Sequence, residues 1–235
     1  MSHTYAEPGK YIVKIFGSTY THIQYDEEDP DGENCNLISR IFDPDLPISS
    51  SVKSVDSLCR FAVRLLNVNI SGASSAHVLD MYNVSALFFG CSNLINVSGF
   101  TRYAAFRYVG SMFYRCWSLK TTDFIFPNWC IFCDSTFFEC SELIASIQAI
   151  LPQGTAGAGF VSNYIGMTRT FYGCSKLTGT IPNGMLWDNP LIKFNIADSE
   201  TATAKTFKNA SEEIRLQVPD NWGGLIPTNS AIQNA

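Results

Sequence analysis

The chain has 235 residues, of which 46% are apolar, 13% aromatic and 16% charged, and its formal net charge is −5. Disordered chains combine few aromatic residues with high net charge, so this composition excludes disorder. The Lys and Arg residues are few and scattered, which excludes the basic footprint of a nucleic-acid binder. No apolar run approaches the roughly 18 residues of a membrane-spanning helix, and the length predicts one or two domains.

The N-terminal segment differs from the rest of the chain. Met1–Tyr5 lacks the features of a secretory signal peptide, so we expect action at the place of synthesis or exit inside an assembled virus particle. The turn signal Pro8-Gly9 precedes an alternating run that includes Tyr11–Phe16. This run resembles the last strands of a PKD-type β-sandwich, although it is too short for that domain. We expect residues 1–50 to form a small β-hairpin cap over the first repeat, with an acidic loop.

An internal repeat dominates the middle of the chain. The pattern Phe-aromatic-x-Cys-x-x-Leu occurs four times, within residues 87–94, 112–119, 136–143 and 170–177. The motif cysteines are 25, 24 and 34 residues apart, and the longest interval holds a Gly-rich insertion at residues 153–160. The predicted repeat core consists of Phe88, Cys91, Leu94, Phe113, Cys116, Leu119, Phe137, Cys140, Leu143, Phe171, Cys174 and Leu177.

Two weaker copies flank the four clear ones. Residues 65–68 echo residues 94–97, and residues 206–211 echo residues 170–175 with Ala210 in place of the cysteine. Atypical end copies are expected in a stack of repeats, because the terminal units must cap it.

The spacing within the motif predicts how each unit folds. Phe88, Cys91 and Leu94 are three residues apart, which places them on one face of a short helical turn. The residues after each Leu predict a short strand, at 94–98, 143–147 and 177–181. One unit cannot bury its apolar face alone, so neighbouring units must stack with their strands in a parallel ladder. The predicted fold class is therefore an α/β solenoid.

The motif resembles the BspA-like leucine-rich repeat of bacterial surface proteins and phage virion proteins, and the resemblance covers roughly Val52 to Val218. It implies an irregular leucine-rich-repeat stack over residues 51–218, followed by a C-terminal tail, residues 219–235. It also implies a non-catalytic role in structure or adhesion.

The eight cysteines are interpreted mainly as packing residues, because synthesis in the cytosol favours reduced thiols and four of them share one motif position. Cys130 and Cys133 have the spacing of a redox dithiol or of half a zinc site. Buried thiols, a disulfide, and metal or redox chemistry all remain open for this pair. The three histidines have no ligand spacing between them: His3, His22 and His77.

Other candidate sites have simpler interpretations. The acidic run at residues 26–33 partly fits a calcium loop, but Ile38 stands where the loop needs a bidentate Glu, so a solvated hairpin tip is favoured. The glycines at 154, 157 and 159 lack a dinucleotide-binding context and predict a flexible excursion. No local signature of a catalytic triad is present. We expect no enzyme activity, no cofactor and no metal.

The tryptophans are the candidate contact residues, because an inward-facing motif leaves aromatic and small polar side chains outside. The alternative is that they are partly buried caps. They are Trp117, Trp129, Trp187 and Trp222.

The favoured function is a virion component, that is, a capsid-decoration, fibre or tail protein. It would bind neighbouring subunits and also a host receptor or glycan. The alternatives are a bacterial cell-surface adhesin module and a cysteine-based metal or redox protein. We expect a homo-oligomer, with the tail wrapping the last repeat or reaching a neighbouring subunit.

Overall fold

The computed structural model describes residues 54–63, 65–69, 82–100, 106–152, 166–182, 186–187 and 206–227. The expected N-terminal cap, the acidic run, the Gly-rich insertion and the three histidines lie outside these residues. The predictions made for them stay predictions.

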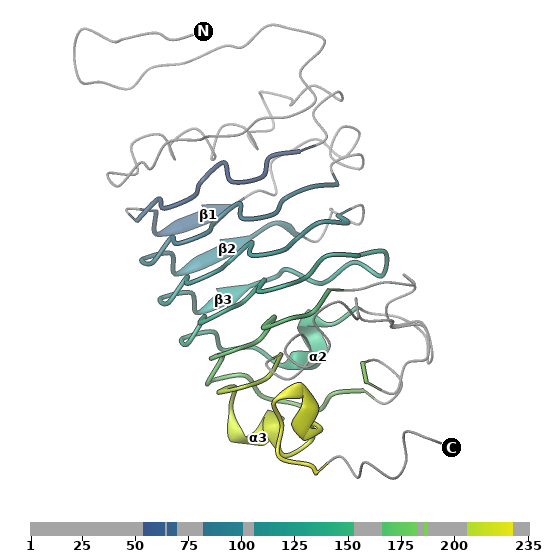
Figure 1. Ribbon diagram of the computed structural model, residues 1–235. Helices are drawn as coiled ribbons and strands as arrows, with labels where there is room; N and C mark the ends of the chain where they lie inside the picture. Colours follow the sequence, from purple (N-terminus) through teal and green to yellow (C-terminus); the bar gives the residue numbers. More distant parts are fainter. Residues whose placement is uncertain are drawn as a thin grey trace, which may run out of the picture.

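The described residues form a stack of coils that run parallel to one another (Figure 1). Isolated parallel bridges join consecutive coils at one position, in the order Ser54, Asn83, Tyr108, Phe132 and Gly166. We number the coils 1 to 6; they comprise residues 54–69, 82–100, 106–129, 130–152, 166–182 and 206–218.

Three short strands form a parallel sheet along one side of the stack. They are β1 (Asn67–Asn69), β2 (Asn96–Ser98) and β3 (Thr121–Thr122), in the order β1-β2-β3. Asn67 pairs with Asn96, and Asn96 with Thr121, so consecutive coils are in register. A further parallel bridge joins Ser146 to Thr178.

Part of the strand prediction is wrong. Ile147 was expected to end a strand, but it begins helix α2 (Ile147–Ile150). Ile147 and Ile150 are three residues apart and both are buried, so one helical turn places both side chains in the core. The segment 177–181 contributes only the bridge at Thr178.

The motif residues form a turn in which successive N–H groups alternate between two kinds of acceptor. In coil 2, Leu87, Phe89 and Cys91 donate to carbonyls three residues earlier in the same turn. The intervening N–H groups donate to carbonyls of the next coil over 2.7–2.9 Å. The donors are Val84, Ala86, Phe88 and Gly90, and their acceptors are, in the same order, Tyr108, Gly110, Met112 and Tyr114. The same alternation recurs in coils 1, 3 and 4, so the buried backbone is satisfied by stacking.

These turns are not the short helical turns that the spacing predicts, because two residues in each have a positive φ. In coil 2 these are Ala86 (53°) and Gly90 (72°), and the equivalent pair in coil 5 is Arg169 and Gly173. A left-handed residue at every fourth position interrupts a right-handed helix. The other pairs are Ser57 and Phe61, Ser111 and Arg115, and Ser135 and Glu139.

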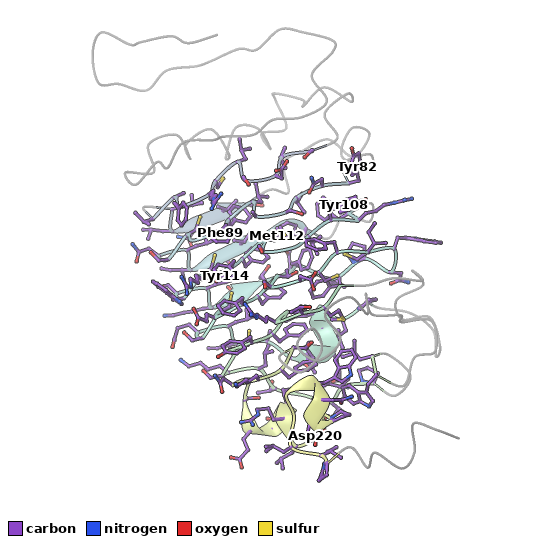
Figure 2. The ribbon with its side chains drawn as sticks, viewed as in Figure 1. Tyr82, Phe89, Tyr108, Met112, Tyr114 and Asp220 are labelled. Carbon is purple, nitrogen blue, oxygen red and sulfur yellow. The ribbon has the colours of Figure 1, made fainter. Side chains whose placement is uncertain are left out.

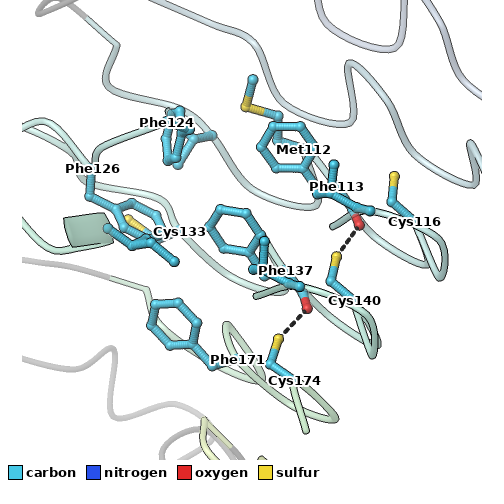
Figure 3. Close-up of a cluster of buried hydrophobic side chains, with 14 of the residues drawn as sticks. Met112, Phe113, Cys116, Phe124, Phe126, Cys133, Phe137, Cys140, Phe171 and Cys174 are labelled. Carbon is cyan, nitrogen blue, oxygen red and sulfur yellow. Dashed lines mark hydrogen bonds between the residues drawn. The ribbon is translucent and has the colours of Figure 1, made fainter. Parts of the chain in front are cut away.

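A ladder of phenylalanine rings runs through the centre of the stack. Phe88, Phe113, Phe137, Phe171 and Phe207 stack with centroids 5.1–5.9 Å apart and interplanar angles of 8–15°. Figure 3 shows the three middle rings, Phe113, Phe137 and Phe171. Further rings meet the ladder edge-on, from Phe100, Phe124 and Phe126. The twelve residues of the predicted repeat core all have 0% exposure.

A second ladder consists of the motif thiols, each of which donates to a carbonyl of the preceding coil. Cys140 donates to the Phe113 oxygen and Cys174 to the Phe137 oxygen, both over 3.0 Å (Figure 3). Cys116 donates to the Phe88 oxygen over 3.1 Å. The Phe113 oxygen also accepts from the Cys116 N–H within its own coil. The thiol therefore satisfies the second lone pair of a buried carbonyl.

Buried threonines make a third ladder in coils 4 to 6. Thr136, Thr170 and Thr206 have 0% exposure. The Thr170 hydroxyl lies 2.9 Å from the Cys133 oxygen of the preceding coil and 2.8 Å from the Met167 oxygen of its own. Each hydroxyl thus links two coils through one buried donor.

We expect Thr170→Val to destabilise the fold by about 1 kcal/mol, because valine keeps the shape but removes the buried donor. For a chain of this size the melting temperature should fall by roughly 2–4 °C. Thr178→Val is the matched control, since Thr178 is exposed. Thermal unfolding of the two variants checks the prediction, and an unchanged melting temperature for Thr170→Val would contradict it.

The C-terminal residues close the end of the stack. Helix α3 (Glu212–Arg215) is capped by Ser211, whose side chain accepts from the Ile214 N–H, and it is followed by the 3₁₀ helix η5 (Asp220–Trp222). The Phe207 N–H donates to the Trp222 oxygen over 2.9 Å, as the Phe171 N–H donates to coil 6. Residues 219–227 therefore wrap the last coil. Of the two alternatives expected for the tail, they follow the first, in which the tail wraps the last repeat rather than reaching a neighbouring subunit.

Candidate binding surface

An outer ladder of aromatic rings lies on one side of the stack. Phe89, Tyr114, Phe138 and Tyr172 stack with centroids 4.4–4.9 Å apart and interplanar angles of 5–15°. Figure 2 shows the first two rings one above the other. Each ring covers the face of its neighbour, so mainly ring edges are left for solvent or a partner. This ladder stabilises the stack more than it offers a contact surface.

Charged side chains border the outer ladder. The Arg60 guanidinium lies 4.9 Å from the centroid of Phe89 at the N-terminal end. Arg115 lies 5.3 Å from the Tyr114 centroid and pairs with Glu139 over 3.0 Å. Both members of this ion pair are partly exposed, so the pair contributes little to stability.

A second set of aromatic residues is more open. The exposed fractions of Tyr82, Tyr108 and Phe132 are 43%, 38% and 42%. Figure 2 shows Tyr82 and Tyr108 on the side of the stack away from Phe89 and Tyr114. The Tyr82 and Tyr108 rings meet at 63° with centroids 6.1 Å apart, and Phe132 leans over Gly110, where any Cβ would collide with its ring.

The backbone brings the residues that directly follow Trp129 close to Arg107. The N–H groups of Ile131 and Phe132 both donate to the Arg107 oxygen, which places the start of coil 4, directly after Trp129, beside Arg107. Trp129 is 63% exposed, more than any other large apolar side chain described, and Arg107 is also exposed. We define the aromatic face as Tyr82, Arg107, Tyr108, Trp129 and Phe132.

The four candidate tryptophans do not share one environment. Trp117 and Trp129 are exposed, at 49% and 63%. Trp187 is half-buried and packs against Trp222 with ring centroids 5.9 Å apart. Trp222 is only 2% exposed and its ring fills the end of the core, which favours the alternative interpretation of a buried cap for this residue.

Four members of the aromatic face, three of them aromatic, were missed in the sequence because they lie outside the repeated motif. Tyr108 and Phe132 each stand five residues before the motif Phe of their own coil, and Tyr82 stands six residues before Phe88. That recurring offset was the available signal. It becomes meaningful only when the bridges at Asn83, Tyr108 and Phe132 place these positions side by side.

A row of aliphatic residues is less continuous than the aromatic face. Leu66, Ile95 and Ile144 are 50%, 37% and 60% exposed, each directly after a motif leucine or its equivalent. Backbone hydrogen bonds run from Ile95 to Leu66, from Lys120 to Ile95 and from Ile144 to Lys120. The charge of Lys120 therefore interrupts the apolar row.

The described thiols are poorly suited to nucleophilic chemistry. Burial raises the pKa of Cys116, Cys140 and Cys174 well above the ordinary value for a thiol. Burial also raises the pKa of Cys133, with its Cys130 neighbour adding to the effect. A thiol is reactive only as the thiolate, and raised pKa values keep these groups protonated at neutral pH.

Within the described ranges, no group of three or more His, Cys, Asp and Glu side chains is arranged to hold a metal ion. None of the helices in that part of the chain combines the length and the apolar character that crossing a membrane requires. Comparisons with protein-family models, with curated proteins and with solved structures found no match to this chain.

Proposed function

We propose that this chain is a non-catalytic structural and interaction protein built as a leucine-rich-repeat-like solenoid. The observation that carries the proposal is the aromatic face, on which open rings recur from coil to coil beside an exposed arginine. Protein interfaces are enriched in Trp, Tyr, Phe and Arg, and a few such side chains dominate their binding energy.

The inner groups of the stack support this proposal over the cysteine-based alternative. The motif thiols donate to backbone carbonyls, and the threonine hydroxyls link neighbouring coils. Side chains that could do chemistry are therefore engaged in holding the coils together, whereas the open side chains are of the type that makes contacts.

We place the protein in a virion, as a capsid-decoration, fibre or tail protein, and this placement rests on the resemblance of the repeat to those of phage virion proteins. The cell-surface adhesin remains the alternative. In either setting the aromatic face would bind another protein, first of all a copy of the same chain or a neighbouring subunit.

We expect Trp129→Ala to weaken self-association of the full chain by about tenfold or more, because truncating a tryptophan hot spot costs about 2 kcal/mol or more and about 1.4 kcal/mol is already tenfold. Analytical ultracentrifugation over a range of concentrations measures the effect. The melting temperature of the variant should be unchanged, because most of the side chain is in solvent.

Trp117→Ala is the matched control, because Trp117 is also exposed but directly follows Cys116 in the repeat motif and is not a member of the aromatic face. It should leave self-association unchanged. Equal weakening by both substitutions would contradict the assignment of the aromatic face. A full chain that stays monomeric at high concentration would contradict self-association itself.

A further inference from the structure

The thiols of Cys130 and Cys133 touch inside the stack, with 3.2 Å between their sulfur atoms. Both residues have 0% exposure. The Cys130 thiol also points toward the Arg107 oxygen at 3.4 Å. Within the described ranges, no third His, Cys, Asp or Glu side chain joins the two thiols in a group that could hold a metal ion.

This contact differs from the environment of the motif thiols. Cys116, Cys140 and Cys174 each donate to a backbone carbonyl at 3.0–3.1 Å. In the Cys130 and Cys133 pair, by contrast, the thiol of one residue faces the sulfur of the other. Packing alone does not require two sulfurs to approach more closely than van der Waals contact.

We propose that Cys130 and Cys133 form an oxidation site that closes to an intrachain disulfide. A disulfide bond is about 2.05 Å long, so closure needs the sulfurs to approach by only about 1 Å. Backbone hydrogen bonds hold the segment around the pair, since the Cys130 N–H donates to the Pro127 oxygen and the Phe132 N–H to the Arg107 oxygen.

The oxidant is a small disulfide such as oxidised glutathione. One cysteine thiolate attacks a glutathione sulfur, which forms a mixed disulfide and releases one glutathione thiolate. The second cysteine thiolate then attacks the protein sulfur of the mixed disulfide and releases the second glutathione. Two protein thiols are oxidised, one glutathione disulfide is reduced, and the two protons end on the two glutathione thiols.

Burial makes this reaction slow in the folded protein. Local opening must first admit the oxidant, and the raised pKa of Cys133 keeps the thiolate scarce at neutral pH. As long as the pH is below the thiol pKa, each unit by which the pH is raised should increase the rate by up to about tenfold, because the thiolate is the nucleophile.

The disulfide would fix one part of the aromatic face. Trp129 directly precedes Cys130, and Phe132 directly precedes Cys133. The inference about oxidation does not depend on the proposed function, because the sulfur contact exists whether or not the face binds a partner.

The test is peptide mapping of the full-length reduced protein after incubation with oxidised glutathione. Thiols still free are blocked under denaturing conditions; disulfides are then reduced and labelled with a second reagent. We expect the second label on Cys130 and Cys133, and the first label on Cys116, Cys140 and Cys174. The intact mass before labelling should fall by two hydrogen atoms.

Two variants sharpen the test. Cys133→Ala should abolish the loss of two hydrogens, whereas Cys140→Ala should retain it; alanine stands naturally at this position of the repeat in coil 6, as Ala210. The proposal is overturned if Cys130 and Cys133 keep the first label after long incubation at alkaline pH. It is also overturned if the second label appears equally on the motif cysteines.

Discussion

Phe137→Ala should destabilise the protein by about 3–5 kcal/mol, the usual range for truncating a fully buried Phe. Phe137 lies in the middle of the inner ladder, between Phe113 at 5.1 Å and Phe171 at 5.9 Å. The edges of Phe124 and Phe126 also meet its ring, at 6.0 and 5.9 Å. Because coils on both sides contact the ring, they cannot collapse into the cavity without losing register.

Thermal and urea unfolding of the full chain would measure this loss. Trp117→Ala is a suitable control, because it also removes a large aromatic side chain but from an exposed position. We expect the control to change the free energy of unfolding by less than about 0.5 kcal/mol. A Phe137→Ala variant that melts within a degree or two of the wild type would show that the ring ladder does not hold the coils together.

The repeated positions could be identified in the sequence because periodic burial imposes periodic residue types. Phe137, Cys140 and Leu143 are apolar and three residues apart, and each has 0% exposure. The local geometry of the turn could not be predicted in the same way. Its left-handed positions hold residues as different as Ser135 and Glu139, so no residue type marks them.

Contacts between coils account for the other differences. Nothing in the sequence of residues 143–147 distinguishes the expected strand from the observed start of α2, because Ile147 suits the buried side of either element. The open rings of Tyr108 and Phe132 come together only through the stacking of coils 3 and 4.

The C-terminal tail illustrates how a terminal unit replaces a missing neighbour. In the inner coils, the N–H of the motif Phe donates to the coil that follows, but coil 6 has no following coil. The Phe207 N–H instead donates to the Trp222 oxygen, and the Trp222 ring is buried at the same end. Gly223 (φ 90°) allows the close approach, since a Cβ there would lie 2.6 Å from the Lys208 nitrogen.

Trp222→Ala should therefore destabilise the fold by about 3–5 kcal/mol, as for other buried aromatic side chains. Deleting residues 219–235 should cost at least as much, because it also removes the backbone acceptor of the Phe207 N–H. The buried tail thus predicts a loss of folding stability, whereas a tail that reached a neighbouring subunit would affect assembly. Urea unfolding and ultracentrifugation of the same samples would separate the two effects.

Deletion of residues 228–235 alone is the matched control, because it leaves Trp222 and the hydrogen bonds of residues 219–227 in place. We expect this shorter deletion to leave the free energy of unfolding within about 0.5 kcal/mol of the full chain. If the longer deletion also left it unchanged while self-association was lost, Trp222 would be an interface residue after all. If the longer deletion instead lowers the free energy of unfolding, and assembly is lost only together with folding, Trp222 belongs to the cap. Trp129 and the aromatic face are then the surface for partners.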